Sequence, residues 1–299
     1  MIRFALKSMA GRKLRSVLTA LAIVLGVAMM SGAYVLTDTI DKAFDSIFVD
    51  SYAGTDTVVT GKDPGFSFEG ESAQPPPIPA ETLERIRAID GVEVATGSVQ
   101  DFQTKLLRPD GEAIETGGAP AFAFGIETDA EYDRFNPLNL VEGRWPEGGD
   151  EVAIDEGVAG DEDLELGDRI GVAAIGPAQE FEIVGIAKYG DLSSIGGATF
   201  AIFDVPTAQE LLGKDGQLDA VQAAAEDGVT PEELTQRISA ELGSDVTVRT
   251  GVERAEEQSS EIATFTTIIR YFLLSFAGIA LFVGAFVIFN TLSITVAQR

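Results

Sequence analysis

The chain has 299 residues, of which 45% are hydrophobic and 23% are charged, a composition too apolar for a disordered protein. It contains no cysteine and no histidine, which excludes disulfide frameworks, Cys/His zinc sites and catalysis of the Ser-His-Asp or Cys-His type. The 48 acidic and 21 basic residues give a net charge of -27, so a nucleic acid is not expected as a partner.

Charge is divided sharply along the chain. The first 37 residues contain five basic residues and no acidic one, whereas every acidic residue lies between Asp38 and Glu261. That middle segment holds 14 basic residues against 48 acidic ones, a net charge of -34. A border this sharp indicates that the chain has different surroundings on its two sides.

The border coincides with an apolar segment. Residues 16–37 form 22 consecutive positions without a charged side chain, and a helix of that length covers about 33 Å, enough to span a bilayer. In residues 1–15, apolar side chains recur at helical spacing beside basic ones, which predicts a cytoplasmic amphipathic helix on the inner leaflet. The alternative is a charged tail that only sets topology. A cleavable signal peptide would have a shorter apolar region than this one.

The helical spacing of apolar residues continues beyond the first span. Ile40, Phe44 and Ile47 fall on one face, with acidic residues on the other side. This pattern predicts a stalk helix over residues 38–55.

After the first stalk, in residues 56–251, short strands alternate with turns and a few helices. Two helix–strand units, within residues 80–99 and 230–250, lie far apart in sequence and predict one α/β subdomain made of residues 56–135 and 213–251. The intervening residues 136–212 have short apolar runs separated by turns, which predicts an inserted β-rich subdomain. The expected fold class is an α+β membrane protein whose two transmembrane helices, extended as stalks, flank these subdomains.

A second stalk precedes a second span. Ile262, Phe265 and Ile269 form an apolar stripe in residues 252–270, a segment without glycine or proline. We expect this stripe to pack against the first stalk or against a partner. The segment then leads into an uncharged span over residues 271–289 and a more polar extension over residues 290–299.

The charge pattern predicts the orientation in the membrane. Basic residues flank the first span on its N-terminal side, which places the N-terminus in the cytoplasm by the positive-inside rule. Residues 38–270 are then extracytoplasmic, and residues 290–299 return to the cytoplasm. The sequence therefore predicts a multi-pass protein of the cell (plasma) membrane, with lipid as its surroundings.

No group of residues has the spacing of a catalytic or metal site. The acidic run at residues 161–165 lacks the order of an EF-hand loop, and Glu256, Glu257 and Glu261 fit the wet face of a stalk helix. We therefore expect a binding or force-transmitting protein and not an enzyme, without a cofactor of its own.

Several stretches resemble the MacB-type, FtsX-like permease family of ABC transporters. Residues 12–21 (RKLRSVLTAL) resemble the family's entry into its first span, and residues 289–299 (FNTLSITVAQR) resemble the exit from the second. The extracytoplasmic core domain of such permeases is similar to this chain at residues 143–146 (GRWP), 151–154 (EVAI) and 166–170 (LGDRI).

The resemblance implies a permease subunit that works with a separate ATP-binding subunit. The ATPase cycle would move the outside domain through the stalks, for export, lipoprotein handling or mechanotransmission. Further permease helices or a second permease copy are implied as partners, with residues 290–299 as the start of a truncated permease domain. The candidate contacts on the ATPase side are Arg12, Lys13, Arg15 and Arg299.

A two-span extracellular sensor, the input module of a chemoreceptor or histidine kinase, is the alternative. It shares the order of span, outside domain and span. The basic amphipathic segment favours the permease, because most two-span sensors need only a short basic tail. A sensor would continue past Arg299 into a helical signalling segment, whereas a permease would continue into more apolar spans.

Overall fold

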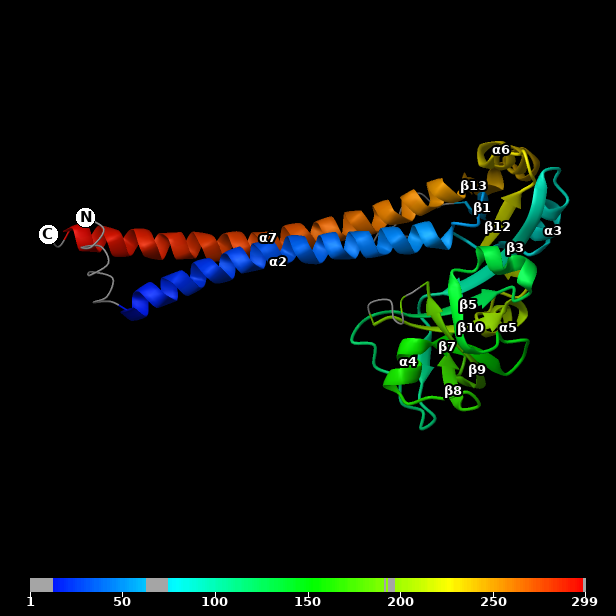
Figure 1. Ribbon diagram of the computed structural model, residues 1–299, viewed down its shortest axis with the longest axis horizontal. Helices are drawn as coiled ribbons and strands as arrows, with labels where there is room; N and C mark the ends of the chain where they lie inside the picture. Colours follow the sequence, from blue (N-terminus) through cyan, green and yellow to red (C-terminus); the bar gives the residue numbers. More distant parts are fainter. Residues whose placement is uncertain (1–12, 63–74, 191, 193–196, 298–299) are drawn as a thin grey trace. The chain divides into compact units, whose positions relative to one another are not determined.

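Two long helices enclose the rest of the chain in sequence (Figure 1). Helix α2 (Lys13–Ser51) has 39 residues and helix α7 (Gly251–Ala297) has 47. At 1.5 Å per residue these helices are about 58 Å and about 70 Å long. The expected architecture, two long apolar helices flanking a mixed α+β domain, is confirmed. The computed structural model describes residues 13–62, 75–190, 192 and 197–297.

The chain divides into two compact units, and both long helices contribute to each. The first unit, residues 1–46 with 258–299, pairs the apolar parts of α2 and α7. Small residues line this contact, since a side chain at Gly26 would overlap the side chain of Leu281, and Ala33 and Ala277 are buried. Small side chains at such an interface allow membrane helices to approach closely.

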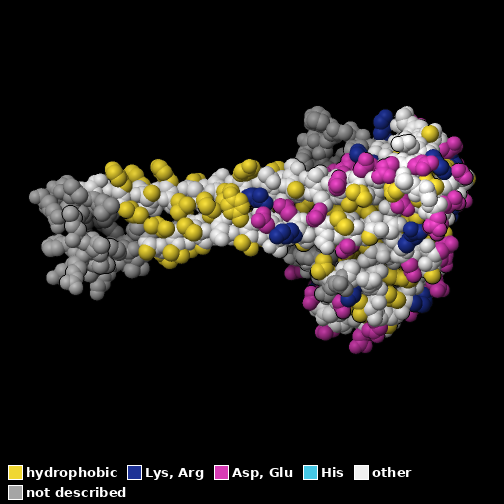
Figure 2. All heavy atoms as spheres, turned by 45° about the horizontal axis from the view of Figure 1, so that its top comes forward, with side chains coloured by type: hydrophobic (Ala, Val, Ile, Leu, Met, Phe, Trp, Pro, Cys, Tyr) yellow, Lys and Arg dark blue, Asp and Glu magenta, His cyan; other side chains and the backbone are white. Residues whose placement is uncertain are grey.

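Most other apolar side chains of the first unit face outward, as Figure 2 shows along the two helices. Leu25, Phe272 and Phe282, for example, are 58%, 63% and 72% exposed. Two stretches are long and apolar enough to cross a membrane, Ile23–Ser51 and Gly251–Asn290. An outward apolar surface on helices of this length indicates a location in a membrane.

The second unit, residues 47–257, is built on a mixed sheet that has eleven strands in the described part of the chain. Its strand order is β13-β1-β12-β3-β5-β10-β7-β9-β8-β4, and β6 pairs with β9. The β5–β10 and β7–β9 pairs are parallel, and the other pairs are antiparallel. A separate two-stranded sheet joins β2 and β11. The strands are β1 (Thr57–Gly61), β2 (Ile78–Pro79), β3 (Val92–Asp101), β4 (Lys105–Leu107), β5 (Ala121–Ile126), β6 (Leu138–Gly143), β7 (Glu151–Asp155), β8 (Arg169–Ala173), β9 (Gln179–Tyr189), β10 (Thr199–Asp204), β11 (Gln217–Leu218), β12 (Ala220–Ala225) and β13 (Val246–Thr250).

Strands β13, β1, β12 and β3 form what we call the first sheet half. Within it, β1 pairs with β13 on one side and with β12 on the other. Helix α3 (Glu81–Arg87) contacts β3, and helix α6 (Pro231–Leu242) contacts β13 and β1. This arrangement joins the two helix–strand units that the sequence predicts far apart in the chain.

The ends of α6 follow from local sequence signals. The hydroxyl of Thr230 accepts a hydrogen bond from the amide of Glu233 at 3.2 Å, and Pro231 occupies the first turn. Gly243 ends the helix with a φ of +77°, a conformation that favours glycine. The short 3₁₀ helices are η1 (Ala130–Phe135) and η2 (Gly243–Asp245).

The remaining strands, β5, β10, β7, β9, β8, β4 and β6, form the second sheet half. Strands β4 and β5 precede residue 136, the expected start of the insertion, yet they pair with β8 and β10. The sheet also continues from β3 to β5 through three residue pairs, of which Gln100↔Phe124 is the middle one. The strand pairing therefore differs from the expected boundary, because sequence patterns indicate local structure but not which distant strands pair.

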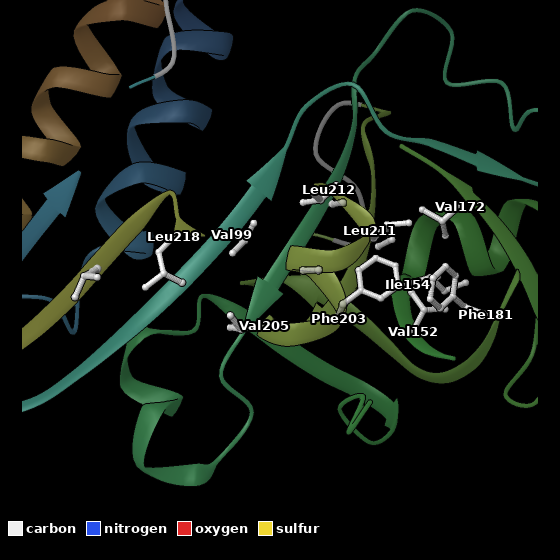
Figure 3. Packing of buried hydrophobic residues seen from close by; sticks show 14 of the residues in the cluster. Val99, Val152, Ile154, Val172, Phe181, Phe203, Val205, Leu211, Leu212 and Leu218 are labelled. Atoms are coloured by element: carbon white, nitrogen blue, oxygen red, sulfur yellow. The ribbon is translucent and has the colours of Figure 1, made fainter. Parts of the chain in front are cut away.

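Helix α5 (Val205–Leu211) packs on the junction of the two sheet halves, against β3 and β5. A side chain on Gly125 would lie 2.4 Å from the Cβ of Ala208, so glycine allows this helix to sit close to the sheet. Further into the second half, the rings of Phe181 and Phe203 meet edge to face with centroids 4.8 Å apart (Figure 3). Full burial of such side chains contributes about 1.5–3 kcal/mol each.

Candidate functional site

The predicted cytoplasmic coupling residues lie at the ends of the described chain. Lys13 and Arg15 belong to the first turn of α2, and the placement of their side chains is not described. Arg12 and Arg299 lie outside the described residues. Contact of these four residues with an ATP-binding subunit therefore stays a prediction.

The predicted stalk stripes are only partly buried in this chain. Ile47 is buried, whereas Phe265 is 60% exposed, so packing of Phe265 against a partner stays a prediction. Two threonines of the first unit are buried, Thr266 of α7 at 1% exposed and Thr37 of α2 at 0% exposed. The other predicted residues are half-buried: Ile40, Phe44, Ile262 and Ile269.

A polar cluster, which we call the Arg270 clasp, links α2 to α7 within the first unit. The Nε of Arg270 donates to the hydroxyl of Thr37 at 2.8 Å. Its Nη2 donates to carboxylate oxygens of Asp38 at 3.0 Å and Asp41 at 3.2 Å. The hydroxyl of Thr266 also donates to Asp41. One guanidinium on α7 thus binds three side chains on α2.

The fork of an arginine side chain suits this position, because a lysine ammonium could not reach three acceptors in fixed directions. The guanidinium carbon also lies 5.7 Å from the ring centroid of Tyr34, within the range of a cation–π contact. The side chains of Arg270 and Asp41 are 24% and 29% exposed, whereas that of Asp38 is 59% exposed. The Asp41 pair therefore contributes more than the Asp38 pair, which water screens.

The charge pattern of the sequence indicates the clasp, whereas the apolar stripes do not. Arg270 is the only charged residue between Glu261 and Arg299. Asp38 is the first charged residue after the uncharged residues 16–37. Two opposite charges, each at the border of an apolar helix, are expected to pair when those helices lie side by side.

Backbone contacts without room for a side chain fix the C-terminal end of α2 in the second unit. A Cβ on Gly54 would lie 1.9 Å from the carbonyl oxygen of Arg134 in η1. A Cβ on Gly251, the first residue of α7, would lie 2.2 Å from the carbonyl oxygen of Thr55. Only glycine fits at these two positions, so the end of α2, η1 and the start of α7 pack backbone against backbone.

An ion cluster reinforces the start of α7. Glu257 pairs with Arg249 of β13 at 3.0 Å and with Arg254 of α7 at 2.9 Å. The Glu257 side chain is 23% exposed. This carboxylate therefore ties the first turns of α7 to the last residues of the sheet.

The stretches that resemble the core domain of MacB-type permeases come together around β9. Arg144 binds Glu151 through two nitrogens, with Nη1 2.7 Å from Oε2, and this pairing lowers the pKa of Glu151 to about 2. A Cβ on Gly143 would lie 2.2 Å from the carbonyl oxygen of Val184 and 3.0 Å from a methyl group of Leu166. These residues hold loops onto the sheet and do not form a catalytic arrangement.

Asp155 is a buried carboxylate at the end of β7. Its oxygens accept hydrogen bonds from the amides of Val158 at 2.9 Å and Phe200 at 3.0 Å, so it caps helix α4 (Glu156–Asp161) and joins it to β10. The residue is 1% exposed, and burial raises the pKa of its carboxyl group to about 6. Because both oxygens already bind backbone amides, this group serves the fold.

The described residues contain no group of three or more acidic side chains arranged to hold a metal ion. A cavity of about 150 Å³ beside β4 and β8 is lined by Arg108 and Arg169. Both arginines pair with carboxylates, Arg108 with Glu162 and Arg169 with Glu180. Both arginines of this cavity are thus paired within the chain.

The fold and these contacts define a class of protein, an α+β domain flanked in sequence by two long apolar helices. The sequence model of the MacB-like periplasmic core domain matches residues 16–241. The chain belongs to this family, the ABC transporter permeases with a MacB-like periplasmic core domain, which have no catalytic activity of their own.

Two permeases illustrate the relationship. The chain is 24% identical over 312 residues to an ABC transporter permease of Methanocaldococcus jannaschii, which covers 100% of this chain and 72% of the relative. It is 29% identical over 149 residues to an ABC transporter permease protein of Mycobacterium tuberculosis, which covers 50% of this chain and 16% of the relative.

Two solved structures match parts of this chain. The periplasmic region of MacB from Actinobacillus actinomycetemcomitans matches with a TM-score of 0.47 at 13% identity, over 69% of this chain and 94% of that one. The extracellular domain of the ABC-type transporter YknZ from Gram-positive bacteria matches with a TM-score of 0.45 at 17% identity, over 64% of this chain and 99% of that one.

Proposed function

We propose that this permease carries movement between a separate ATP-binding subunit and an extracytoplasmic domain. The observation that supports the proposal is the continuity of the two helices. Helix α2 leads into β1 within six residues of Ser51, and α7 begins directly after β13 ends at Thr250. Each strand of the β1–β13 pair is thus joined to a helix that contains a candidate membrane span.

The Arg270 clasp supports the proposal because it makes the two helices act as a pair. A helix resists bending and stretching, since each of its interior residues is held by internal hydrogen bonds. If the two helices could slide past each other, part of a movement applied at one end would be taken up by sliding and would not reach the other end. The bonds from Arg270 to α2 oppose sliding, so a movement at one end of the pair reaches the other end.

The orientation follows from charge. The N-terminus with its basic residues would lie in the cytoplasm, and the acidic residues 38–261 would lie outside. The substrate role, whether export, lipoprotein handling or mechanotransmission, would then depend on what the extracytoplasmic domain contacts.

The test of the coupling uses the permease purified in complex with an ATP-binding subunit that assembles with it. Amide hydrogen exchange along residues 251–270 is compared between an ATP-trapped state and an ADP state in lipid nanodiscs. We expect exchange in this segment to depend on the nucleotide, and we expect Arg270→Met to reduce the difference. An ATP-binding subunit that assembles with the permease and leaves this segment unchanged would contradict the proposal.

The orientation can be tested separately because the chain has no cysteine. Ser244, in η2, is exposed and can be replaced by cysteine. We expect a membrane-impermeant thiol reagent to label Ser244→Cys in intact cells and to label Ser8→Cys only after lysis. The opposite pattern would reverse the topology.

A further inference from the structure

Tyr189 connects the second sheet half to the end of α2. Strand β9 ends at Tyr189, whose hydroxyl donates to the carbonyl oxygen of Ile47 at 3.2 Å. The same hydroxyl forms a hydrogen bond with the hydroxyl of Ser51, the last residue of α2. The Ser51 hydroxyl also lies 2.7 Å from the carbonyl oxygen of Ile47, so the two hydroxyl hydrogens are shared among these three contacts. Tyr189, Ser51 and Ile47 form what we call the Tyr189 latch.

The neutral hydroxyl of Tyr189 donates a hydrogen bond in the last turn of α2, where backbone carbonyl groups need donors. The last turn of a helix concentrates carbonyl groups with partial negative charge, which favours a hydrogen-bond donor there. Tyr189 is 8% exposed, and burial raises the pKa of its hydroxyl to about 12. The hydroxyl therefore keeps its proton throughout the physiological range.

The backbone of Tyr189 is held firmly by its own sheet half. It pairs with Leu138 of β6. Its amide donates to the carbonyl of Leu192 at 3.1 Å, and the amide of Leu192 donates back at 2.8 Å. The backbone of Tyr189 is therefore held by the second sheet half, while its hydroxyl is bonded to α2.

The topology shows why this contact matters. The chain leads from α2 directly into β1, which lies in the first sheet half. The first half joins the second through the β3–β5 ladder, which has three residue pairs, so a displacement passing that way crosses a short connection. The Tyr189 latch connects α2 to the second half without passing through β3.

We infer that Tyr189 is a positioning residue that makes the second sheet half move together with the end of α2. Without its hydroxyl, α2 still moves the first half through β1, but the second half follows only through the sheet and the packing around η1. This role in transport rests on the proposed function, whereas the geometry of the latch does not.

The test measures a distance within the second unit of the full permease assembled with its ATP-binding subunit. Spin labels are attached to Val49→Cys, near the end of α2, and Ile175→Cys, in the loop between β8 and β9. Both side chains are exposed, at 54% and 76%. We expect a narrow distance distribution in the parent and one at least twofold wider in Tyr189→Phe, which keeps the ring and removes the hydroxyl.

A matched control removes a different phenol. The hydroxyl of Tyr132 accepts a hydrogen bond from Arg87 at 3.0 Å and lies in η1, so Tyr132→Phe deletes a hydrogen-bonding hydroxyl without touching α2. We expect this variant to retain the parent's distribution. Ser51→Ala keeps the bond from Tyr189 to Ile47 and should widen the distribution less than Tyr189→Phe does. If Tyr189→Phe fails to fold, Ser51→Ala carries the test, and a parent-like distribution in that variant then overturns the inference.

The same samples separate the inference from the proposed function. A distribution of unchanged width in a folded Tyr189→Phe variant overturns the inference, whatever the nucleotide. A wider distribution in a permease that shows no nucleotide-dependent change anywhere supports the latch and overturns the coupling function. Both hold if the distribution widens and the parent's helices respond to ATP.

Discussion

Replacing Arg270 by methionine tests whether the clasp holds the two helices together. The substitution keeps an unbranched side chain and removes the hydrogen bonds to Thr37, Asp38 and Asp41. A hydrogen bond to a charged group contributes about 1.5–3 kcal/mol when buried. The Asp38 pair is largely exposed and the Asp41 pair partly so, which reduces their contributions. The expected loss is about 2 kcal/mol, or about 30-fold in the local opening equilibrium.

Amide hydrogen exchange of the protein in lipid nanodiscs measures this opening directly. In Arg270→Met we expect residues 34–46 and 258–270 to exchange about 30-fold faster, while β3 and α6 keep their protection. Arg85→Met is the matched control, because Arg85 lies 3.9 Å from Glu241 in a pair whose side chains are both more than half exposed. This control should leave exchange in both helix segments unchanged.

The partner side of the clasp supplies a stricter test. Asp41→Asn removes the charge that Arg270 faces and retains an oxygen to accept from Thr266. Because Arg270→Met leaves Asp41 charged without its partner, the double variant should lose clearly less protection than the sum of the two single losses. Exchange rates within twofold of the parent in Arg270→Met, or strictly additive losses, would refute this reasoning.

Two further predictions concern stability. Folding raises the pKa of Asp155 from its ordinary value of 3.8 to about 6, so the folded chain holds the proton more tightly. This group therefore lowers the free energy of unfolding as the pH rises from about 4 to about 6, by about 3 kcal/mol, and the loss persists at higher pH. Thermal unfolding at pH 4 and pH 7 should show Asp155→Asn gaining stability relative to the parent at the higher pH, and a pH-independent difference would contradict the charging cost. Gly54→Ala should lower the thermal midpoint by several degrees, because its Cβ would overlap the carbonyl oxygen of Arg134. Gly32→Ala, in a helix with nothing within 4 Å of the new Cβ, should not lower it, and equal effects of the two would show that the close contact does not exist.

Local and long-range features of the fold differ in how well the sequence predicts them. Apolar length predicts the two long helices, and Thr230, Pro231 and Gly243 predict both ends of α6, because each signal lies within a few residues of its effect. The pairing of β5 with β10 joins residues about eighty positions apart and leaves no local pattern. The expected boundary at residue 136 therefore separated strands that belong to one sheet half.

The candidate site shows the same limit on a smaller scale. The apolar stripe predicts that Phe265 packs against the first stalk or against a partner, whereas the side chain that the structure buries against α2 is the neighbouring Thr266. One position along a helix turns the side chain by about 100°. A polar bond such as Thr266 to Asp41 can decide which face turns inward, because a buried polar group without a partner costs free energy. Hydrophobic spacing does not contain that information, whereas the opposite charges of Arg270 and Asp38 do.

The register of β1 and β13 determines how the domain would respond to mechanical load. Thr57, the first residue of β1, pairs with Thr250, the last residue of β13, so α2 and α7 attach to the same end of this antiparallel ladder. Forces that pull α2 and α7 apart, perpendicular to the strands, would load one residue pair at a time. The first pair to be loaded would be Thr57 and Thr250. A ladder attached at opposite ends would be loaded in shear, with all its rungs sharing the force. This attachment makes the base of the domain compliant to spreading of the helices, and the Glu257 cluster and the backbone contact of Gly251 lie at the end where such opening would begin.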